Sequence, residues 1–443
     1  MDIITLALAK KQIGKDTTKA VSDYLDEHLT NPTNPPIDTS LSIAGAAADS
    51  KATGDKLSEL KEDISDILNT PFVKFYNHIS NPFIKTTIKM VGDSITAGYG
   101  GTGYSLTDES IIGSTQKTNV KSAICWANML YHYLDDTFGG SKIVEASDSR
   151  ITADGTYQVN MNVTIGAQQI TYHSLYTSNT VAKKIIEFDM YGSEFTVIYS
   201  KASPYGIFDI YVDGVKNTSV DCYAVSTTHG VTLTIDGLTE STHTVAIYAT
   251  NDKNASASSK QFYIHGFIIN KVIEYHNYGI SGTAVNSGYN TDGRYTVNDD
   301  FAFIMYGTNN RVTTATYRGF ITEYKKLYDL LAGTYGITPI IVSPPPASEA
   351  QDATSQNTTY MFHTYDLQMA IREISKAYNV PYIDVYNAIL EYSSIHNLDY
   401  TTLFVDGLHP NDSGYDVIYH TVIKELGLPI MPPYKEWYQP LNN

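Results

Sequence analysis

Hydrophobic and polar positions follow different patterns in different parts of the 443-residue chain. Short apolar runs at residues 86–91, 301–306, 340–343 and 382–385 have the length of buried strands. Between such runs, as in residues 320–331, apolar residues recur every three or four positions, which is typical of a helix with one buried face. Strands that alternate with helices predict a parallel sheet covered by helices on both faces.

The middle of the chain changes to a period of two. Four segments alternate apolar and polar residues, and Asp213-Gly214 and Asp236-Gly237 mark tight turns near them. The four segments are residues 195–199, 208–212, 231–235 and 244–248. We therefore predict an α/β domain over residues 83–140 and 271–443, interrupted by an inserted all-β sandwich over residues 141–270.

Residues 1–82 form a third part, in which two short helical patterns flank the proline-rich segment 31–36. From Ile43 onward, positions spaced by three and four follow the heptad spacing, although Ser50 and Thr53 fill it poorly. The pattern fits a short oligomerising coiled coil, and it equally fits one amphipathic helix lying on its own domain. We predict an N-terminal helical stalk for attachment and oligomerisation.

Composition excludes several classes of partner. A formal charge of −17 argues against nucleic acid, whose binders concentrate basic residues on one face. No window approaches the apolar length of a membrane helix, and the N-terminus lacks the basic and apolar regions of a signal peptide. The 36 tyrosines serve a packed β core or a sugar-binding or protein-binding surface. We expect no membrane insertion.

Cysteine usage narrows the chemistry further. Cys125 and Cys222 are the only cysteines, they are far apart, and no CxxC pair occurs. This pattern excludes a cysteine-based zinc site and gives no support for a disulfide. We interpret both residues as buried thiols, and we see no metal cluster.

Two short motifs supply the residues that serine ester cleavage needs. Ser94 follows the first strand, at the sheet edge where open α/β sheets bind ligands, and Gly92 permits a tight turn before it. Asp406 stands three residues before His409, a spacing that directs a carboxylate and an imidazole toward one point. Each motif alone also fits an ordinary turn. Together they predict a catalytic triad of Ser94, His409 and Asp406.

These motifs belong to a set of four that resembles the SGNH (GDSL-like) hydrolase family. The blocks are Gly-Asp-Ser-Ile-Thr at residues 92–96, Asn-Tyr-Gly-Ile-Ser-Gly at 277–282, Tyr-Gly-Thr-Asn-Asn at 306–310 and Asp-Gly-Leu-His at 406–409. The resemblance implies a flavodoxin-like three-layer α/β/α sheet and no cofactor. It also implies Ser94 as nucleophile, His409 as general base and then acid, and Asp406 as the residue that orients His409.

The resemblance further assigns the oxyanion hole to the backbone N–H groups of Ser94 and Gly279 and to the side-chain amide of Asn309. Family members often carry aspartate where this chain has Asn310, which we interpret as structural. Two other features stay open: His276 either lines the site or is a surface or capping residue, and the prolines 344–346 either shape a crevice wall or form only a rigid loop.

Two weaker resemblances concern biological context. Residues 6–11 and 41–54 resemble N-terminal regions of tail and baseplate proteins from phages of Gram-positive bacteria, and the β insert resembles jelly-roll modules beside carbohydrate esterases. They imply a virion protein made in the host cytoplasm, a homotrimer, and contacts to other tail or baseplate proteins through residues 1–82. We expect an esterase that removes O-acetyl groups from a bacterial surface glycan. The alternatives are a lipase or general acylhydrolase, and a receptor-binding tail protein with a vestigial hydrolase fold.

Overall fold

The computed structural model describes residues 70–105, 123–154, 156–165, 168–177, 182–289, 294–311, 316–355, 358–359 and 362–429. The predicted heptad stalk lies outside the described residues. The chain divides into two compact units. Unit 1 comprises Met1–Asn77, Lys89–Asn128 and Asn277–Asn443, and unit 2 comprises His78–Ile88 and Met129–His276.

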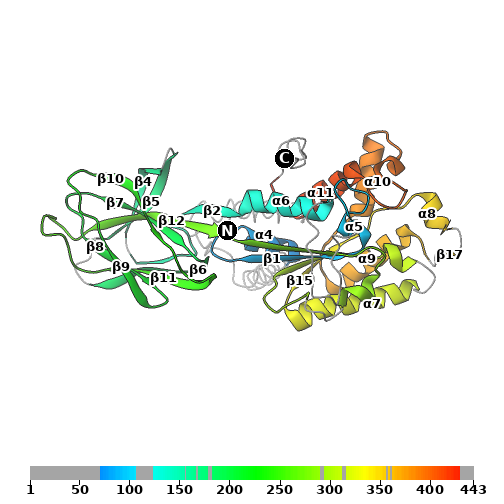
Figure 1. The fold of residues 1–443 in the computed structure, drawn as a ribbon, viewed down its shortest axis with the longest axis horizontal. Coiled ribbons are helices and arrows are strands. Elements are labelled where there is room, and N and C mark those ends of the chain that lie inside the picture. The colour runs from blue at the N-terminus through cyan, green and yellow to red at the C-terminus, as the bar shows by residue number, and fades with distance from the viewer. Residues whose placement is uncertain are drawn as a thin grey trace, which may run out of the picture. The chain divides into compact units, whose positions relative to one another are not determined.

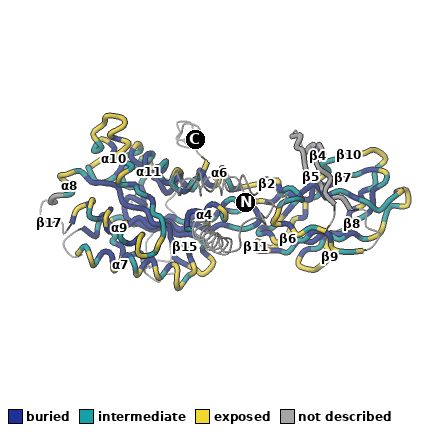
Figure 2. The backbone as a smooth tube through the Cα atoms, turned by 180° about the vertical axis from the view of Figure 1, so that it is seen from behind, coloured by how far each residue is buried: buried dark blue, intermediate teal, exposed yellow. Residues whose placement is uncertain are grey.

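Unit 1 contains β14, β15 and β18 of a five-stranded sheet with the order β13-β1-β14-β15-β18, and these three strands run parallel. The strands are β1 (Thr86–Gly92), β13 (Ile273–Gly279), β14 (Phe301–Met305), β15 (Thr338–Val342) and β18 (Tyr382–Ile383). All five residues of β14 are buried, as expected for a strand covered on both faces. The dark blue strands between α7 and α11 in Figure 2 show the same burial. The predicted parallel sheet is confirmed.

Helices lie on both sides of this sheet, with α7 and α9 on one side and α11 on the other (Figure 1). On one face Ala302 and Ile304 pack against α7 and α9. On the other face the rings of Phe303 and Phe75 are in contact, with 5.3 Å between their centroids. The helices are α4 (Pro71–Ile79), α5 (Ser94–Ala97), α6 (Trp126–Phe138), α7 (Tyr317–Asp329), α8 (Glu349–Ala353), α9 (Thr364–Tyr378), α10 (Val385–Ile395) and α11 (Asp412–Glu425). None of the helices in the described ranges combines the length and apolar character needed to cross a bilayer.

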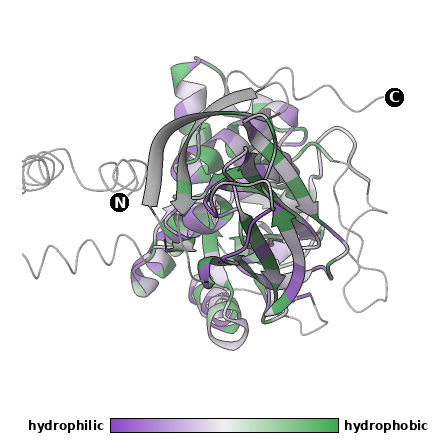
Figure 3. Ribbon diagram, turned by 90° about the vertical axis from the view of Figure 1, so that its left-hand side faces the viewer, coloured by the Kyte–Doolittle hydropathy of each residue, from purple (hydrophilic) through white to green (hydrophobic). Residues whose placement is uncertain are grey.

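Unit 2 consists of two antiparallel sheets whose apolar side chains share one core. Figure 3 shows hydrophobic and hydrophilic positions interspersed along the strands. One sheet has the order β10-β7-β12-β5-β4, with β2 also on β12, and the other β3-β6-β11-β8-β9. The strands are β2 (Gly140–Glu145), β3 (Thr152–Ala153), β4 (Thr156–Ile165), β5 (Gln168–Thr177), β6 (Lys183–Gly192), β7 (Phe195–Lys201), β8 (Ile207–Val212), β9 (Val215–Asp221), β10 (Thr228–Ile235), β11 (Ser241–Ala249) and β12 (Phe262–Lys271).

The two predicted turns of this unit have different outcomes. Asp213 and Gly214 both have positive φ and join β8 to β9, with Val212 paired to Val215, as a two-residue hairpin requires. Asp236-Gly237 is not a tight turn between paired strands. It connects β10, which pairs with β7, to β11, which pairs with β6 and β8 of the other sheet. A dipeptide signal cannot distinguish a hairpin from a connection between sheets.

A buried polar cluster joins three strands of unit 2. Ser200 Oγ lies 2.6 Å from His229 Nδ1 and 2.7 Å from His265 Nε2. His265 is fully buried, and this burial, together with the charge of His229, lowers the pKa of His265 from 6.5 to about 3. His265 therefore stays neutral in the folded protein.

This cluster predicts acid destabilisation. Between pH 6.5 and about 3 the unfolded chain binds a proton at position 265 that the folded chain does not, so stability falls as the pH decreases. We expect His265→Gln to flatten the pH dependence of the urea unfolding midpoint across this window. A wild-type profile no steeper than that of the variant would contradict the assignment.

Candidate active site

The sequence around Ser94 places its side chain where the first strand meets a short helix. β1 ends at Gly92 and α5 begins at Ser94, while the side chain of Asp93 accepts a hydrogen bond from Ile95 N at 3.0 Å. A Cβ at position 92 would lie 2.1 Å from Thr96 Oγ1, so this turn requires glycine. Ser94 is thus held at the carboxyl end of a sheet strand, as predicted.

The segment between η5 (Tyr400–Leu403) and α11 carries the other two predicted residues. Asp406 Oδ1 accepts hydrogen bonds from the backbone N–H groups of Leu408 and His409, at 2.9 and 2.8 Å. Asp406 Oδ2 lies 2.8 Å from His409 Nδ1, and His409 Nε2 lies 2.9 Å from Ser94 Oγ. The structure therefore brings the three predicted triad residues into one hydrogen-bonded line.

Electrostatics keep the carboxylate of this line charged. Partial burial of Asp406 favours its neutral form, but hydrogen bonds from the backbone and imidazole of His409 and from Leu408 N outweigh burial and lower the pKa of Asp406 below its ordinary value. An anionic Asp406 holds the proton of His409 on Nδ1. His409 Nε2 is then the nitrogen that accepts a proton from Ser94.

The loop of Asp406 is supported by the segment that follows β15. Pro344–346 are buried, and beyond them Ser348 N donates to Gly407 O at 2.6 Å. Gln351 Nε2 donates to Asp406 O at 3.1 Å. The proline segment, for which a crevice wall and a rigid loop were both left open, thus leads into residues that fix the position of the acid.

The local contacts of two of the three predicted oxyanion donors are compatible with that role, which stays a prediction. Ser94 is the first residue of α5, so its N–H has no acceptor within the helix. Asn309 Nδ2 donates to Thr283 O at 2.9 Å, a bond that uses one of its two amide hydrogens. Asn310 is structural, as interpreted, because its Oδ1 accepts from Val285 N at 3.0 Å.

The third predicted donor, the backbone N–H of Gly279, needs correction. It donates to Asn277 Oδ1 at 2.9 Å, so it is already engaged. A Cβ at position 279 would lie 2.2 Å from Ala97 N, which shows that the close approach of Gly279 is to α5. The glycine was predicted for close approach to a substrate, and sequence alone does not say what a glycine approaches.

Gly282, in the same block, is a further candidate donor that the sequence reasoning did not name. It is exposed, has a φ of +75°, and its N–H has no acceptor among the described residues. Ile280 N donates to Gly92 O at 3.1 Å and Thr283 O accepts from Asn309, so the loop around Gly282 connects the strand before Ser94 to the amide donor. The second glycine of the block was the available signal.

The remaining sequence candidates lie outside this arrangement. His276 Nε2 is 2.6 Å from Glu274 Oε1, and Glu274 also pairs with Lys85, which favours the interpretation of His276 as a surface residue. Cys125 and Cys222 are free and buried, and burial raises the pKa of Cys125 to about 12. Within the described residues, no group of three or more His, Cys, Asp or Glu side chains is arranged to hold a metal.

A cavity of about 570 Å³ lies in unit 2, between residues 80–82, the end of α6 and the segment 142–150. Its lining includes Lys142, Glu145 and Arg150. Asp148 and Arg150 bind each other through two hydrogen bonds of 2.8 and 2.6 Å. Because none of its lining residues belongs to the triad, the chemistry assigned to Ser94 does not depend on this cavity.

Comparison with protein families matches residues 250–417 to the GDSL-like Lipase/Acylhydrolase family. The matched range is less than half of the chain; it contains Asn309, Asp406 and His409, whereas Ser94 lies before it. Comparison with curated protein sequences gives no match.

Several solved structures match parts of the chain. "Peptidoglycan O-acetylesterase in action, 5 min" is 14% identical and covers 81% of this chain and 95% of its own, with a TM-score of 0.34. An acetylxylan esterase from Geobacillus stearothermophilus is 18% identical, covering 37% and 76%, with a TM-score of 0.29. A family two carbohydrate esterase from Clostridium thermocellum is 13% identical, covering 62% and 98%, with a TM-score of 0.26. TM-scores this low assign no substrate to this chain.

The two neighbouring asparagines make the oxyanion site testable. Asn309→Ala removes a transition-state donor, and we expect kcat for ester hydrolysis to fall by about 10²–10³-fold. Asn310→Ala instead leaves the buried Val285 N–H without its acceptor, so it should lower the thermal midpoint while the folded enzyme keeps its kcat. Equal kcat losses in both variants would contradict the assignment.

Proposed function

We propose that this protein is a serine esterase in which Ser94 is the nucleophile, His409 the general base and acid, and Asp406 the residue that orients His409. The observation that carries the proposal is the line of hydrogen bonds from Asp406 Oδ2 through both imidazole nitrogens to Ser94 Oγ. The match of residues 250–417 to GDSL-like lipases and acylhydrolases supports the same reaction class.

The reaction would proceed by acyl transfer in two halves. Ser94 Oγ attacks the ester carbonyl carbon while His409 Nε2 takes the hydroxyl proton, and the carbonyl oxygen becomes an oxyanion facing the donors of Ser94 N and Asn309. His409 then gives this proton to the departing alkoxide, which leaves as an alcohol. Water, deprotonated by His409, attacks the acyl-enzyme, releases the carboxylic acid and restores Ser94.

For the substrate, we propose an O-acetyl group on a bacterial surface polysaccharide. The support is the combination of this site with a separate all-β unit in one chain, and with the tail-like N-terminal sequence. The solved structures compared above carry titles that name acetyl esters of peptidoglycan and xylan for those proteins. The competing candidate is a general acylhydrolase or lipase, which the name of the matched family also includes.

For the biological setting, we propose a phage tail or baseplate protein, or its prophage counterpart, that attaches through residues 1–82 and forms a homotrimer. The sequence of residues 41–67 is the support for this part. Attachment to a virion would present the esterase to a polymer on the cell surface. A receptor-binding role without catalysis remains the competing function from another class.

Hydrolysis of p-nitrophenyl esters tests the activity and the acyl preference together. We expect Ser94→Ala to lower kcat by about 10⁴-fold or more, whereas Ser413→Ala, at an exposed position of α11, should match wild type. Equal rates for wild type and Ser94→Ala would refute the esterase.

Acetate should turn over faster than butyrate or longer esters. Faster turnover of the longer esters would refute the deacetylase and favour the acylhydrolase. Release of acetate from candidate host glycans, followed by mass analysis, then tests the polysaccharide. Cell binding undiminished by Ser94→Ala, with no hydrolysis by wild type, would support the receptor-binding alternative.

A further inference from the structure

We infer that Tyr99 positions the general base, by holding the imidazole of His409 against its ring and by stabilising the imidazolium that forms during the reaction. The inference rests on the proposed function, because it assigns Tyr99 a part in the same acyl transfer. Neither the four sequence blocks nor the triad includes this residue. Tyr99 acts through His409, so it is a positioning residue.

The contact between the two rings is close. The ring centroids of Tyr99 and His409 are 4.3 Å apart, with an angle of 44° between the ring planes. His409 already has Asp406 on Nδ1 and Ser94 on Nε2, so its edge is held at both nitrogens. Tyr99 instead contacts the imidazole ring of His409 through its own aromatic ring.

The backbone of Tyr99 is tied to the nucleophile on one side and to α11 on the other. Tyr99 N donates to Ser94 O at 2.9 Å, and Tyr99 O accepts from the hydroxyl of Tyr415 at 2.8 Å. Tyr415 is fully buried in α11. These bonds fix the distance between the start of α5 and the helix that follows His409, with Tyr99 between them.

Two further contacts fix the loop after Tyr99. Gly100 has a φ of +93°, and a Cβ there would lie 2.6 Å from Pro410 O, so only glycine allows the loop to approach the chain next to His409. Thr102 N and Thr102 Oγ1 donate to the two carboxylate oxygens of Asp412, at 2.7 and 2.8 Å. The position of the Tyr99 ring is therefore set by the backbone.

The chemistry gives this contact a preference for the transition state. His409 is neutral before it accepts the proton of Ser94 and becomes cationic as the tetrahedral intermediate forms. A cation within about 6 Å of an aromatic centroid is attracted by the ring, whereas a neutral imidazole gains much less. Because the attraction grows with the charge, its loss should lower kcat and kcat/KM together and leave KM unchanged.

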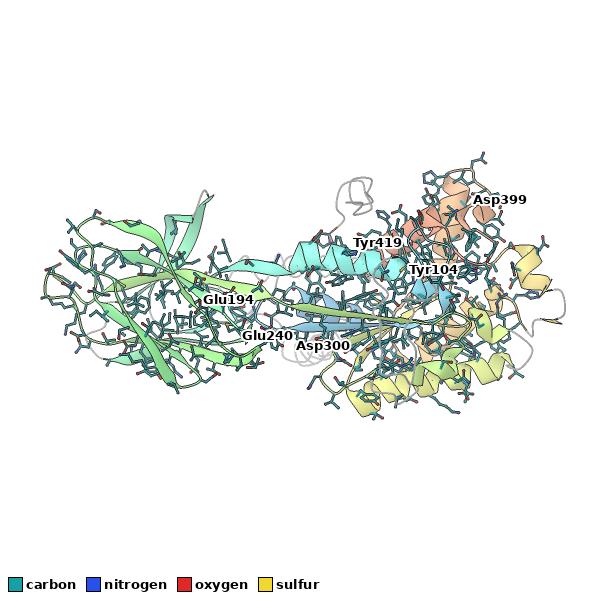
Figure 4. All side chains as sticks on the ribbon, in the orientation of Figure 1. Tyr104, Glu194, Glu240, Asp300, Asp399 and Tyr419 are labelled. Carbon is teal, nitrogen blue, oxygen red and sulfur yellow. The ribbon has the colours of Figure 1, made fainter. Side chains whose placement is uncertain are left out.

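Tyr104 continues the same loop and has a different connection. Its ring lies 5.2 Å from that of Tyr99, and its hydroxyl is 3.1 Å from Ser281 Oγ, next to Gly282. Tyr104 is labelled in Figure 4. The loop of residues 98–104 thus contacts His409 at Tyr99 and the loop of Ser281 at Tyr104. Tyr99 touches a triad side chain, so it carries the inference.

The chain offers a matched control in α10. There Tyr392 and His396 form an equivalent pair, with ring centroids 4.2 Å apart and 40° between planes, and no triad residue takes part. Tyr99→Phe keeps the ring without the hydroxyl, and Tyr99→Leu keeps apolar bulk without the ring. Tyr392→Leu removes the control pair.

The test measures kcat and KM on p-nitrophenyl acetate for wild type and these three variants, together with their thermal midpoints. We expect Tyr99→Leu to lose about 5- to 30-fold in kcat with unchanged KM, the range expected for a cation over an aromatic ring. Tyr99→Phe should retain the activity of wild type within twofold, and Tyr392→Leu should match wild type.

Two results would overturn the inference. If Tyr99→Leu and Tyr99→Phe have the same kcat, only the bulk of the side chain matters at position 99. If Tyr99→Leu raises KM and leaves kcat unchanged, Tyr99 contacts the substrate instead. If Tyr99→Leu fails to fold, Tyr99→Met, which keeps the apolar volume on a flexible chain, should show the same loss of kcat. Failure of the proposed function is a separate outcome, recognised by wild-type hydrolysis that equals that of Ser94→Ala.

Discussion

The hydrogen bond between Ser94 Oγ and His409 Nε2 joins residues 315 positions apart, and the site depends on keeping those two atoms at 2.9 Å. A serine hydroxyl and a histidine side chain each have several rotamers, so their hydrogen bond forms reliably only if the fold holds both in position. The fold fixes them from two sides. In the sheet, β1, which leads to Ser94, lies beside β14. The loop after α5 is hydrogen-bonded to α11 by Tyr99, which accepts from Tyr415, and by Thr102, which donates to Asp412.

Several neighbouring features follow from this constraint. Gly92, Gly100 and Gly279 each sit where a Cβ would collide with backbone or side chain of another segment. They bring the nucleophile turn, the base loop and the second block within contact of one another. Asp406 is likewise held by Gln351 and by its own backbone partners, so its carboxylate is directed at His409 before any substrate binds.

Much of this could be predicted from sequence, and the exceptions have physical causes. Apolar runs predicted β1, β14, β15 and β18, and helical spacing predicted α7. The triad followed from two short motifs whose residues needed only to meet at one sheet edge. The hydrogen bond from Gly279 N to Asn277 Oδ1 could not be predicted, because a side chain folding back on its own backbone leaves no periodic signal. The contact of Tyr99 with His409 was missed because it arises between loops that are far apart in the sequence.

The central claim is that Ser94 is an activated nucleophile. Treatment of the full chain with a fluorophosphonate, followed by intact mass measurement and peptide mapping, tests it most directly. The account predicts one adduct per chain on the peptide containing Ser94, and loss of that adduct in His409→Ala. A folded wild-type protein that takes no adduct, or takes it at another residue, would contradict the account.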